Sequence, residues 1–455
     1  MILDQSILRE WDIRGVYPTQ INEETAKALG YAYGSYLNDK KISYCVVGRD
    51  NRLGGEELAK SLMLGLIDSG INIIYLDIVT TPMFNFASIK LKLEYGIMIT
   101  ASHNPKNDNG FKIFGKDYLH LVRSELEKVY ELIKNNEKVI SSTKGWIKKL
   151  DISDAYAEDL ANSLVFGSQK LKVVIDCGNG TASTIIKKVY EKFNFETEFI
   201  FADSDPTFPN HHPDPSVEVN LKALKDKVIE TKANLGIAYD GDCDRFGIVD
   251  ELGNMIESDR LMAIFIRDIF PKVDNKSFII DVKCSKALED EISKIGGKSV
   301  MVRNGSAFIE TYVHDYPSLF GGEYSGHLFF RDRHYGYDDG IYMGLRLQEI
   351  LSNMPIKCSE LSNGLNRYFN TPELRVKVSD GQKFDIVNKV KEYCQANNYE
   401  FLDIDGVRVK YPDGWALVRA SNTGPNLTLR FEATTRERLA ELLKEFTVVI
   451  NKLVK

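Results

Sequence analysis

Two short loops of the chain carry side chains whose types and spacing suit phosphoryl chemistry. The first, TASHNP, presents the hydroxyl of Ser102, and the second, DGDCDR, places carboxylates at Asp240, Asp242 and Asp244. Clustered carboxylates repel one another unless a cation compensates them, and a set of oxygen ligands suits Mg²⁺. A phosphorylated Ser102 could supply one more oxygen to the same ion. The two loops together therefore indicate phosphoryl transfer at a serine beside a divalent metal.

Each loop follows a short apolar segment that predicts a buried strand, at Tyr95–Ile99 and at Leu235–Tyr239. Ligands of α/β domains gather at the carboxyl ends of strands, which favours a functional interpretation of both loops. A polar turn and an acidic turn remain the structural alternatives. A serine hydrolase is disfavoured, because Ser102 has no G-x-S-x-G elbow around it. In addition, His103 is adjacent to it in the chain and is not normally placed to deprotonate it.

Two further turns carry groups that could bind a sugar phosphate. GGEYSGH presents Glu323, Ser325 and His327. Its carboxylate and hydroxyl could bind vicinal sugar hydroxyls, and its imidazole could move a proton. RASNTGP, which begins at Arg419 and is followed by Arg430, is rich in donors and has no acid, as is typical of an anion-binding turn. Each could instead be a structural turn.

Basic side chains accompany these motifs along the chain. Lys112 lies shortly after the serine loop, Arg245 ends the aspartate loop, and Lys283 follows another apolar strand. DIRG, near the start, contains Arg14, and GRDNR ends at Arg52. Their proximity favours an anionic ligand, although each alone could be a surface or structural charge.

A strand–helix–strand pattern occurs three times along the chain. The expected segments are Tyr44–Gly48, Gly54–Ser69 and Ile71–Leu76; then Lys172–Asp176, Thr181–Asn194 and Thr197–Phe201; then Ser277–Asp281, Ser285–Ile295 and Lys298–Val302. Short connections of this kind favour right-handed crossovers between parallel strands. We therefore expect three related α/β domains with mixed, largely parallel sheets between helices.

The last part of the chain follows a different pattern. Strands are expected at Pro372–Ser379, Leu402–Tyr411, Trp415–Ala420 and Leu427–Glu432, and helices at Lys383–Ala396 and Arg436–Lys452. This order predicts an α+β domain with helices on an antiparallel sheet. The expected domains are residues 1–148 with the serine loop, 149–250 with the aspartate loop, 251–361 with the sugar-binding turn, and 362–455 with the anion-binding turn.

Length and composition narrow the possible functions further. At 455 residues the chain is too long for one core, and a net charge of −7 argues against a dedicated nucleic-acid surface. The six cysteines form no C-x-x-C pair, which is typical of a reducing compartment. Neither a secretory signal nor a stretch of about 20 apolar residues is present. We therefore expect a cytoplasmic protein with no membrane partner.

In order along the chain, these motifs resemble the α-D-phosphohexomutase superfamily, and most closely its bifunctional phosphomannomutase/phosphoglucomutase group. The matching motifs are EWDIRG, GRDNRLGG, TASHNPKNDNGFKI, DCGNGTAS, FPNHHPDP, DGDCDRFGIVD, DVKCS, GGEYSGH, YGYDDGIY, DGVRV and WALVRASNTGP. They cover essentially the whole chain. The resemblance implies four domains around one cleft, of which three are related α/β domains and the last is an α+β domain of the TATA-binding-protein-like class.

The resemblance also implies a role for each candidate residue. Ser102 would be the phosphoserine. The Mg²⁺ ligands would be its phosphate with Asp240, Asp242 and Asp244. The residues around the reacting phosphoryl group would be Arg14, Lys112 and Arg245, with His103, Lys112 and His327 as proton-transfer candidates. The substrate-binding residues would be Lys283, Glu323, Ser325, His327, Arg419, Ser421, Asn422 and Thr423, with Arg430 in a supporting position.

The implied reaction is a reversible exchange of a phosphoryl group between the 1- and 6-positions of mannose or glucose. It would run through phosphoserine and a hexose 1,6-bisphosphate, which would also act as the activator. A closed cleft must exclude water, so the last domain is expected to move as a lid. Small-molecule sugar phosphates are the expected partners, and the protein is expected to be a monomer or a dimer.

Three residues depart from the usual pattern of this family. Cys243 replaces a glycine within the aspartate loop, and Ser306 stands where many phosphomannomutases have a histidine. Tyr324 replaces the common methionine of GE-x-S-G-H, where glutamine is more typical of phosphoglucosamine mutases. A phosphoglucosamine mutase, or a relative of broad specificity, remains an alternative. A sugar-phosphate-binding protein without catalysis is an alternative of another class.

Overall fold

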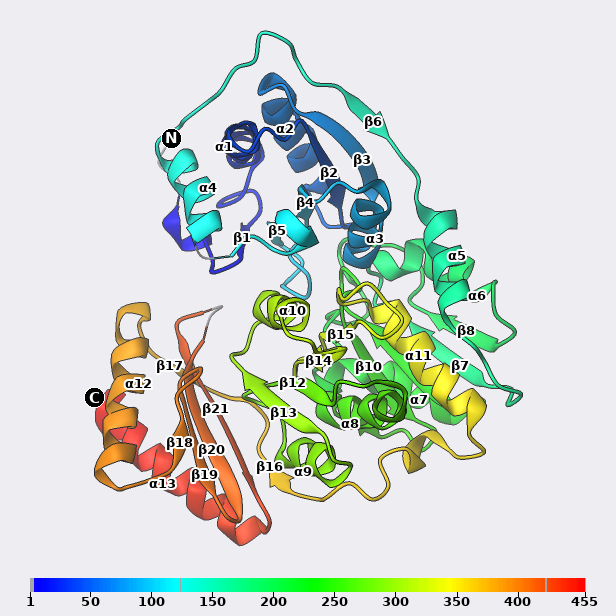
Figure 1. Ribbon diagram of the computed structural model, residues 1–455, viewed down its shortest axis with the longest axis vertical. Coiled ribbons are helices and arrows are strands. Elements are labelled where there is room, and N and C mark those ends of the chain that lie inside the picture. Colours follow the sequence, from blue (N-terminus) through cyan, green and yellow to red (C-terminus); the bar gives the residue numbers. More distant parts are fainter. Residues whose placement is uncertain (1–3, 123, 422–423, 455) are drawn as a thin grey trace. The chain divides into compact units, whose positions relative to one another are not determined.

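Three of the sheets contain the same four-strand arrangement (Figure 1). The computed structural model describes residues 4–122, 124–421 and 424–454. In each of the three sheets a central strand has a parallel neighbour on either side, and an antiparallel strand follows one of them. The strands in this order are β3 (Asn72–Ile78), β2 (Tyr44–Arg49), β4 (Gly96–Ile99) and β5 (Asp108–Phe114); β8 (Glu196–Ile200), β7 (Lys172–Asp176), β9 (Leu235–Tyr239) and β10 (Phe246–Asp250); β13 (Lys298–Val302), β12 (Ser277–Asp281), β14 (Phe320–Gly322) and β15 (Leu328–Phe330). This shared order confirms three related α/β domains with mixed sheets.

Contacts within the chain divide it into two units. The first extends to Ile256 and also includes Arg333–Leu361, and the second comprises Glu257–Asp332 and the chain from Ser362 onward. The first unit contains the serine and aspartate loops, and the second contains the sugar-binding and anion-binding turns. The residue bounds of the four expected domains stay a prediction.

The first sheet is completed by two edge strands, β1 (Asp12–Val16) beside β5 and β6 (Ile147–Lys149) beside β3. Its helices are α1 (Glu23–Asp39), α2 (Gly55–Asp68), α3 (Thr81–Leu91) and α4 (Ser124–Lys134). Glycine lets α1 approach α2 closely, because a Cβ at Gly30 would lie 2.2 Å from the carbonyl oxygen of Leu62. Buried apolar side chains of α1, α2, α4 and the central strands form one core. This core fixes the end of β4, from which the serine loop emerges.

The second sheet ends in the short strand β11 (Met255–Ile256), which pairs with β10. Its helices are α5 (Ser153–Ser163), α6 (Ile186–Tyr190), α7 (Lys222–Thr231) and α11 (Gly340–Asn353). α11 follows the third sheet in the chain but packs here, where Gly344 lies against the side chains of Ile237 and Tyr239 in β9. β9, which leads into the aspartate loop, is therefore covered by a helix from far along the sequence.

The expectation of one helix at Thr181–Asn194 is wrong in its extent. Thr181–Thr184 forms a 3₁₀ turn, and only α6 within this segment is α-helical. The N–H and the hydroxyl of Thr181 both donate to the carbonyl oxygen of Gly241, at 3.0 and 2.9 Å. The first turn is thus tied to the aspartate loop instead of continuing as a regular helix.

An ion pair holds the loop between β8 and α7 against the second sheet. His211 Nε2 lies 3.0 and 3.2 Å from the carboxylate oxygens of Asp176, which is fully buried at the end of β7. Burial alone would lower the pKa of His211, but the hydrogen bond and charge of Asp176 outweigh it, and the pKa is raised above its ordinary value of 6.5. The protonated imidazole is therefore favoured by folding.

We expect His211→Gln to lower the free energy of unfolding most at acid pH. A group whose pKa is raised by folding stabilises the folded state fully below its unfolded pKa, about 6.5 here, and this contribution is lost as the pH rises through the folded pKa. Urea denaturation of the two proteins from about pH 5 to 9 measures the difference, which should shrink as the pH rises. His314→Gln, at an exposed histidine, is the control. A difference that is constant with pH would contradict the ion pair.

The third sheet lies in the second unit. Its helices are α8 (Ser258–Ile269), α9 (Lys286–Lys294) and α10 (Ser306–Asp315). Ile279 of β12 and Phe329 of β15 pack with Ile309 and Val313 of α10 in a small core. This core positions the turn between β14 and β15, which carries the sugar-binding motif.

The fourth sheet is antiparallel and confirms the α+β character of the last part of the chain. Its strands are β16 (Phe369–Asn370), β17 (Leu374–Lys377), β18 (Phe401–Leu402), β19 (Val407–Tyr411), β20 (Gly414–Ala420) and β21 (Asn426–Ala433). The helices α12 (Asp380–Ala396) and α13 (Arg436–Val454) share one core with the sheet. The single strand expected at Leu402–Tyr411 is wrong: β18 and β19 form a hairpin. Gly406, at φ +76°, makes the turn, where a Cβ would lie 2.3 Å from the carbonyl oxygen of Val418.

Polar and apolar contacts join the third and fourth sheets within the second unit. The Oε1 atom of Glu432 accepts hydrogen bonds from the Lys286 N–H and from Trp415 Nε1, both at 2.8 Å. Val282, Trp415 and Leu417 form an apolar cluster beside them. The expected movement of the last domain as a lid stays a prediction. None of the helices described has the length and apolar character needed to cross a membrane.

Candidate active site

The serine loop leaves β4 after Ile99 and turns sharply at Ser102, whose φ is +49°. The Ser102 N–H donates to Thr100 Oγ1 at 2.8 Å. A left-handed conformation is uncommon for a residue with a Cβ, and such conformations gather at functional sites. The turn buries Ser102 and directs its hydroxyl to Asp240, whose Oδ2 accepts a hydrogen bond at 3.0 Å.

His103 lies closer to the serine hydroxyl than its position in the sequence predicts. Its Nδ1 is 3.2 Å from Ser102 Oγ. The left-handed backbone at Ser102 accounts for the difference, because an extended loop would direct neighbouring side chains apart. His103 is therefore placed to exchange a proton with the hydroxyl.

The aspartate loop leaves β9 after Tyr239 and lies directly against the serine loop. A Cβ at Gly241 would come within 2.4 Å of the carbonyl oxygen of Ser102, so the approach requires glycine. Cys243, two residues later in the loop, is buried and has φ +66°. The loop therefore keeps the left-handed backbone that glycine would favour, although the residue is a cysteine.

Lys112 connects two of the three aspartates. Its Nζ lies 2.7 Å from Asp242 Oδ2 and 2.5 Å from Asp244 Oδ2, and all three residues are at least 95% buried. Thr81, at the start of α3, also donates to Asp242 Oδ2, at 2.7 Å. Lys112 lies on β5 next to the strand that carries the serine loop. The first and second sheets thus both contribute to one buried group of charges.

The remaining cations flank the serine. Arg245 donates to Asp240 Oδ2 from Nη2 at 3.0 Å and from Nε at 3.2 Å, and it lies 3.5 Å from Asp214. Arg14 donates from Nη1 to Asn104 Oδ1 of the serine loop at 3.0 Å. Cations on both sides of Ser102 suit a phosphoryl group on its hydroxyl.

The electrostatic balance keeps these groups charged. Burial alone would lower the pKa of Lys112, but Asp242 and Asp244 outweigh it and the pKa is raised. Burial and Asp244 would raise the pKa of Asp242, yet Lys112 and Thr81 hold it below its ordinary value. The pKa of Arg245 is raised, since Asp240 and Asp214 outweigh its burial. Lys112 is consequently a charged donor at neutral pH.

The three aspartates meet the requirements of a hard cation. One oxygen from each of Asp240, Asp242 and Asp244 lies within 4.8 Å of the other two. Among the described residues, Asp242 Oδ1 is buried without a hydrogen-bond partner. Such an atom costs free energy unless something binds it. A buried oxygen-only set with an unused acceptor therefore fits a divalent cation.

In the second unit, the turn between β14 and β15 orients a carboxylate. Ser325 Oγ donates to Glu323 Oε2 at 2.6 Å. Glu323 Oε1 accepts from Asn304 Nδ2 at 2.7 Å and from the Gly305 N–H at 2.5 Å. The Glu323 N–H donates to the carbonyl oxygen of His327 at 2.9 Å, which closes the turn. The motif residues therefore lie together, held by the loop that precedes Ser306 and α10.

Tyr324 packs against Arg430 in the same unit. The guanidinium carbon of Arg430 lies 3.5 Å from the centre of the tyrosine ring. Arg430 is fully buried and donates to the carbonyl oxygen of Lys283, whose own Nζ pairs with Glu373 at 2.8 Å. Its burial and these contacts agree with the expectation that Arg430 holds neighbouring residues in place. Aromatic stacking of this kind is weaker for methionine, so Tyr324 gives the buried cation a partner.

The anion-binding turn is described in part. Arg419 Nε donates to Asp405 Oδ2 at 2.9 Å, and Lys383 Nζ donates to the carbonyl oxygen of Ser421 at 2.9 Å. The expected phosphate-binding residues Asn422 and Thr423 lie outside the described residues.

The structure divides the candidate residues between the units. The first unit brings together Arg14, Ser102, His103, Lys112, Asp240, Asp242, Asp244 and Arg245. The second unit carries Lys283, Glu323, Ser325, His327, Arg419, Ser421 and Arg430. Three residues that hold the first group were not predicted as site residues: Arg52, Thr81 and Asp214. Arg52 and Asp214 lie within motifs, GRDNR and FPNHHPDP, but Thr81 has no motif around it.

Comparisons with known proteins extend over the whole chain. Four family descriptions of phosphoglucomutase/phosphomannomutase match: alpha/beta/alpha domain I at residues 5–140, domain II at 154–253, domain III at 257–368 and the C-terminal domain at 373–448. A phosphomannomutase/phosphoglucomutase of Pseudomonas syringae is 42% identical, over 99% of this chain and 96% of its own. A phosphoglucomutase of Neisseria meningitidis is 36% identical, over 98% of this chain and 97% of its own. The crystal structure of a family protein from Burkholderia thailandensis, 34% identical, covers 100% of this chain and 98% of its own with a TM-score of 0.92.

Proposed function

Because the chain belongs to the phosphoglucomutase/phosphomannomutase family and is a hexose-phosphate mutase, we propose that Ser102 carries the phosphoryl group that it transfers. The observation that supports this role is the contact of the Ser102 hydroxyl with Asp240, 3.0 Å away, inside a buried group of carboxylates and cations. A serine hydroxyl that only stabilises a turn does not require several buried carboxylates and cations around it. The enzyme is an isomerase, since the phosphoryl group moves within the substrate.

In the proposed first step, a free hydroxyl of a hexose 1- or 6-phosphate attacks the phosphorus of phospho-Ser102. The new phosphorus–oxygen bond forms at the sugar as the bond to Ser102 Oγ breaks. Lys112 and Arg245 stabilise the charge that spreads over the transferring group, which is the main catalytic task in phosphoryl transfer. Asp240, Asp242 and Asp244 would hold Mg²⁺, which supplies further charge neutralisation when bound.

Protons must move in the opposite direction to the phosphoryl group. In the first step the sugar hydroxyl loses a proton, and Ser102 Oγ gains one as its phosphoryl group leaves. In the second step Ser102 Oγ loses a proton as it accepts the other phosphoryl group, and the sugar oxygen that is released gains one. Lys112 keeps its proton in this scheme, because its pKa is raised, and it acts as a charged hydrogen-bond donor instead of a base. His103, 3.2 Å from Ser102 Oγ, is the group placed at the serine, and His327 is the candidate at the sugar hydroxyl.

The second step of the proposed reaction returns the other phosphate to Ser102. The intermediate is a hexose 1,6-bisphosphate, which must present each end to Ser102 in turn. Glu323 and Ser325 would bind the sugar hydroxyls in both orientations, and Arg419 and Ser421 would hold the phosphate that does not react. The same bisphosphate would re-prime an enzyme that has lost its seryl phosphate.

The substrate class proposed is mannose and glucose phosphates. Relatives over nearly the full length are named for both sugars or for glucose alone. Tyr324, which stacks on Arg430, replaces a residue that is more typically glutamine in phosphoglucosamine mutases. That class remains the second candidate.

An assay of the purified protein tests the function and its specificity. The substrates are glucose 1-phosphate, mannose 1-phosphate and glucosamine 1-phosphate, each with Mg²⁺ and a trace of the matching 1,6-bisphosphate. We expect turnover of the first two. Turnover confined to the amino sugar would favour the phosphoglucosamine mutase, and no turnover of any would favour a binding protein without catalysis.

A further inference from the structure

The GRDNR motif has no role in the proposed function, yet its last residue is deeply buried. Arg52 keeps only 3% of its surface exposed. Charged side chains are buried to this extent only where specific partners compensate them. The charge of Arg52 is paired with Asp50 at 3.2 Å, and its hydrogen-bond acceptors lie in the serine loop, 50 residues further along the chain.

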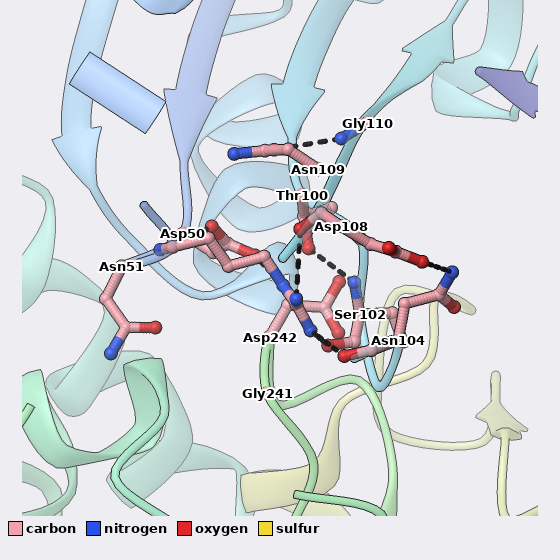
Figure 2. A network of polar contacts seen from close by, with 12 residues as sticks. Asp50, Asn51, Thr100, Ser102, Asn104, Asp108, Asn109, Gly110, Gly241 and Asp242 are labelled. Atoms are coloured by element: carbon pink, nitrogen blue, oxygen red, sulfur yellow. Dashed lines mark hydrogen bonds and ion pairs between the residues drawn. The ribbon is translucent and has the colours of Figure 1, made fainter. Parts of the chain in front are cut away.

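The guanidinium of Arg52 binds four backbone carbonyl oxygens around the serine. Nη2 donates to Ser102 at 2.6 Å and to Asn104 at 2.7 Å. Nη1 donates to Pro105 at 2.8 Å and to Asp108 at 3.1 Å. Figure 2 shows Ser102, Asn104 and Asp108 gathered in this network. A planar fork can hold several carbonyls in fixed directions, which an ammonium group cannot do.

Asp50 holds the same loop from its other end. Its N–H donates to the carbonyl oxygen of Ile99 at 2.9 Å, and its Oδ1 accepts from the Arg52 N–H at 2.9 Å. Thr100 Oγ1 accepts the Ser102 N–H at 2.8 Å. The backbone of Ser102 is therefore fixed at both its N–H and its carbonyl oxygen.

Asn51 connects this arrangement to the second sheet. Its Nδ2 donates to the carbonyl oxygen of Asn179 at 2.8 Å and to Ser204 Oγ at 3.0 Å. Asn179 lies two residues before Thr181, which holds the carbonyl oxygen of Gly241 in the aspartate loop. Figure 2 shows Gly241 and Asp242 beside the serine loop. Asp50–Arg52 thus connects the serine loop to the segment around Asn179 and Thr181, which in turn holds the aspartate loop.

We propose that Arg52 is a positioning residue for phosphoryl transfer, and that Asp50–Arg52 sets the distance between the Ser102 hydroxyl and the aspartates. Arg52 contacts the serine loop through backbone carbonyl oxygens, is paired with the Asp50 carboxylate at 3.2 Å, and acts through Ser102. The left-handed conformation of Ser102 costs free energy and persists only where its surroundings hold it. Reacting groups must also be held within a fraction of an ångström of their productive geometry. This role rests on the proposed function of Ser102.

The test replaces Arg52 with lysine, which keeps the charge and loses the fork. We expect kcat to fall by about 100-fold while KM for the hexose phosphate changes by less than about threefold. The rate at which glucose 1,6-bisphosphate phosphorylates Ser102, followed by intact-protein mass, should fall in parallel. Arg49→Lys is the matched control from the same motif, because Arg49 pairs with Asp77 at 2.9 Å and should leave kcat unchanged.

A second variant decides the question if Arg52→Lys does not fold. Thr100→Val keeps the side-chain shape and removes only the hydroxyl that accepts the Ser102 N–H, so kcat should fall by about tenfold at unchanged KM. A kcat within about threefold of wild type in either folded variant would overturn the role. So would full recovery of kcat on assaying Arg52→Lys well below its melting temperature, because this indicates a purely structural contribution. If the wild-type protein is itself inactive in this assay, the proposed function is wrong. That outcome is distinct from a wild-type protein that is active and an Arg52→Lys variant that is equally active.

Discussion

Ser102→Ala should abolish mutase turnover, with a loss in kcat of more than about 10⁴-fold. The variant retains every aspartate and cation around the site but has no oxygen to carry the phosphoryl group. The fold should be unaffected, because the Ser102 backbone keeps its hydrogen bonds to Thr100 and Arg52. Initial rates on glucose 1-phosphate, with bisphosphate present, measure the effect.

The same variant tests phosphorylation directly. Incubation of the wild-type protein with glucose 1,6-bisphosphate should add the mass of one phosphoryl group, and Ser102→Ala should gain none. Ser88→Ala is the matched control, since Ser88 is also buried but only donates to the carbonyl oxygen of Phe84 within α3. Appreciable turnover by Ser102→Ala would exclude Ser102 as the carrier.

The strands that lead into the site were predictable from the sequence. Lys172–Asp176, Ser277–Asp281 and Lys298–Val302 are observed with the predicted bounds, because a polar residue ends or directly follows each of these apolar runs. The segments that differ are those where a distant contact overrides the local pattern. Thr181 is tied to Gly241, which interrupts the helix expected there. Residues 403–406 form a turn that divides the expected strand at Leu402–Tyr411.

The candidate site follows the same division. The motifs indicated which side chains carry the chemistry, because a serine loop and a cluster of aspartates, each following a buried strand, suit phosphoryl transfer and metal binding. They could not indicate that Ser102 and Asp240, 138 residues apart, are in contact. Nor could they show that Arg52 is buried, since the sequence of a surface arginine looks the same. Residues that act through the backbone of others are therefore the ones that sequence reasoning misses.

The charge balance around Asp242 leads to the second prediction of large effect. The carboxylates of Asp240, Asp242 and Asp244 face two cations, Lys112 and Arg245, so three negative and two positive charges leave one negative charge. A divalent cation makes this sum positive by one, which suits a seryl phosphate of about −1.5 to −2. Neutralising one aspartate removes both a ligand and the charge that attracts the metal.

We therefore expect Asp242→Asn to raise the Mg²⁺ concentration for half-maximal activity by about 100-fold, and to lower kcat at saturating Mg²⁺ by about 100-fold. Asparagine has nearly the shape of aspartate and can still accept from Thr81, so the fold should be retained. Rates measured across a Mg²⁺ titration give both quantities. Asp226→Asn is the control, because Asp226 lies exposed on α7 and pairs with Lys222 of the same helix at 2.6 Å.

Thermal unfolding separates metal binding from catalysis in the same variant. Mg²⁺ that binds only the folded protein should raise the melting temperature of the wild type and of Asp226→Asn. The increase should be absent in Asp242→Asn at the same Mg²⁺ concentration. Without metal, Asp242→Asn should melt lower than the wild type, because the pKa of Asp242 is lowered in the folded protein and its charged carboxylate, paired with Lys112, stabilises the fold. An unchanged Mg²⁺ titration in both measurements would place the metal elsewhere and leave the buried aspartates with Lys112 and Arg245 as a purely structural group.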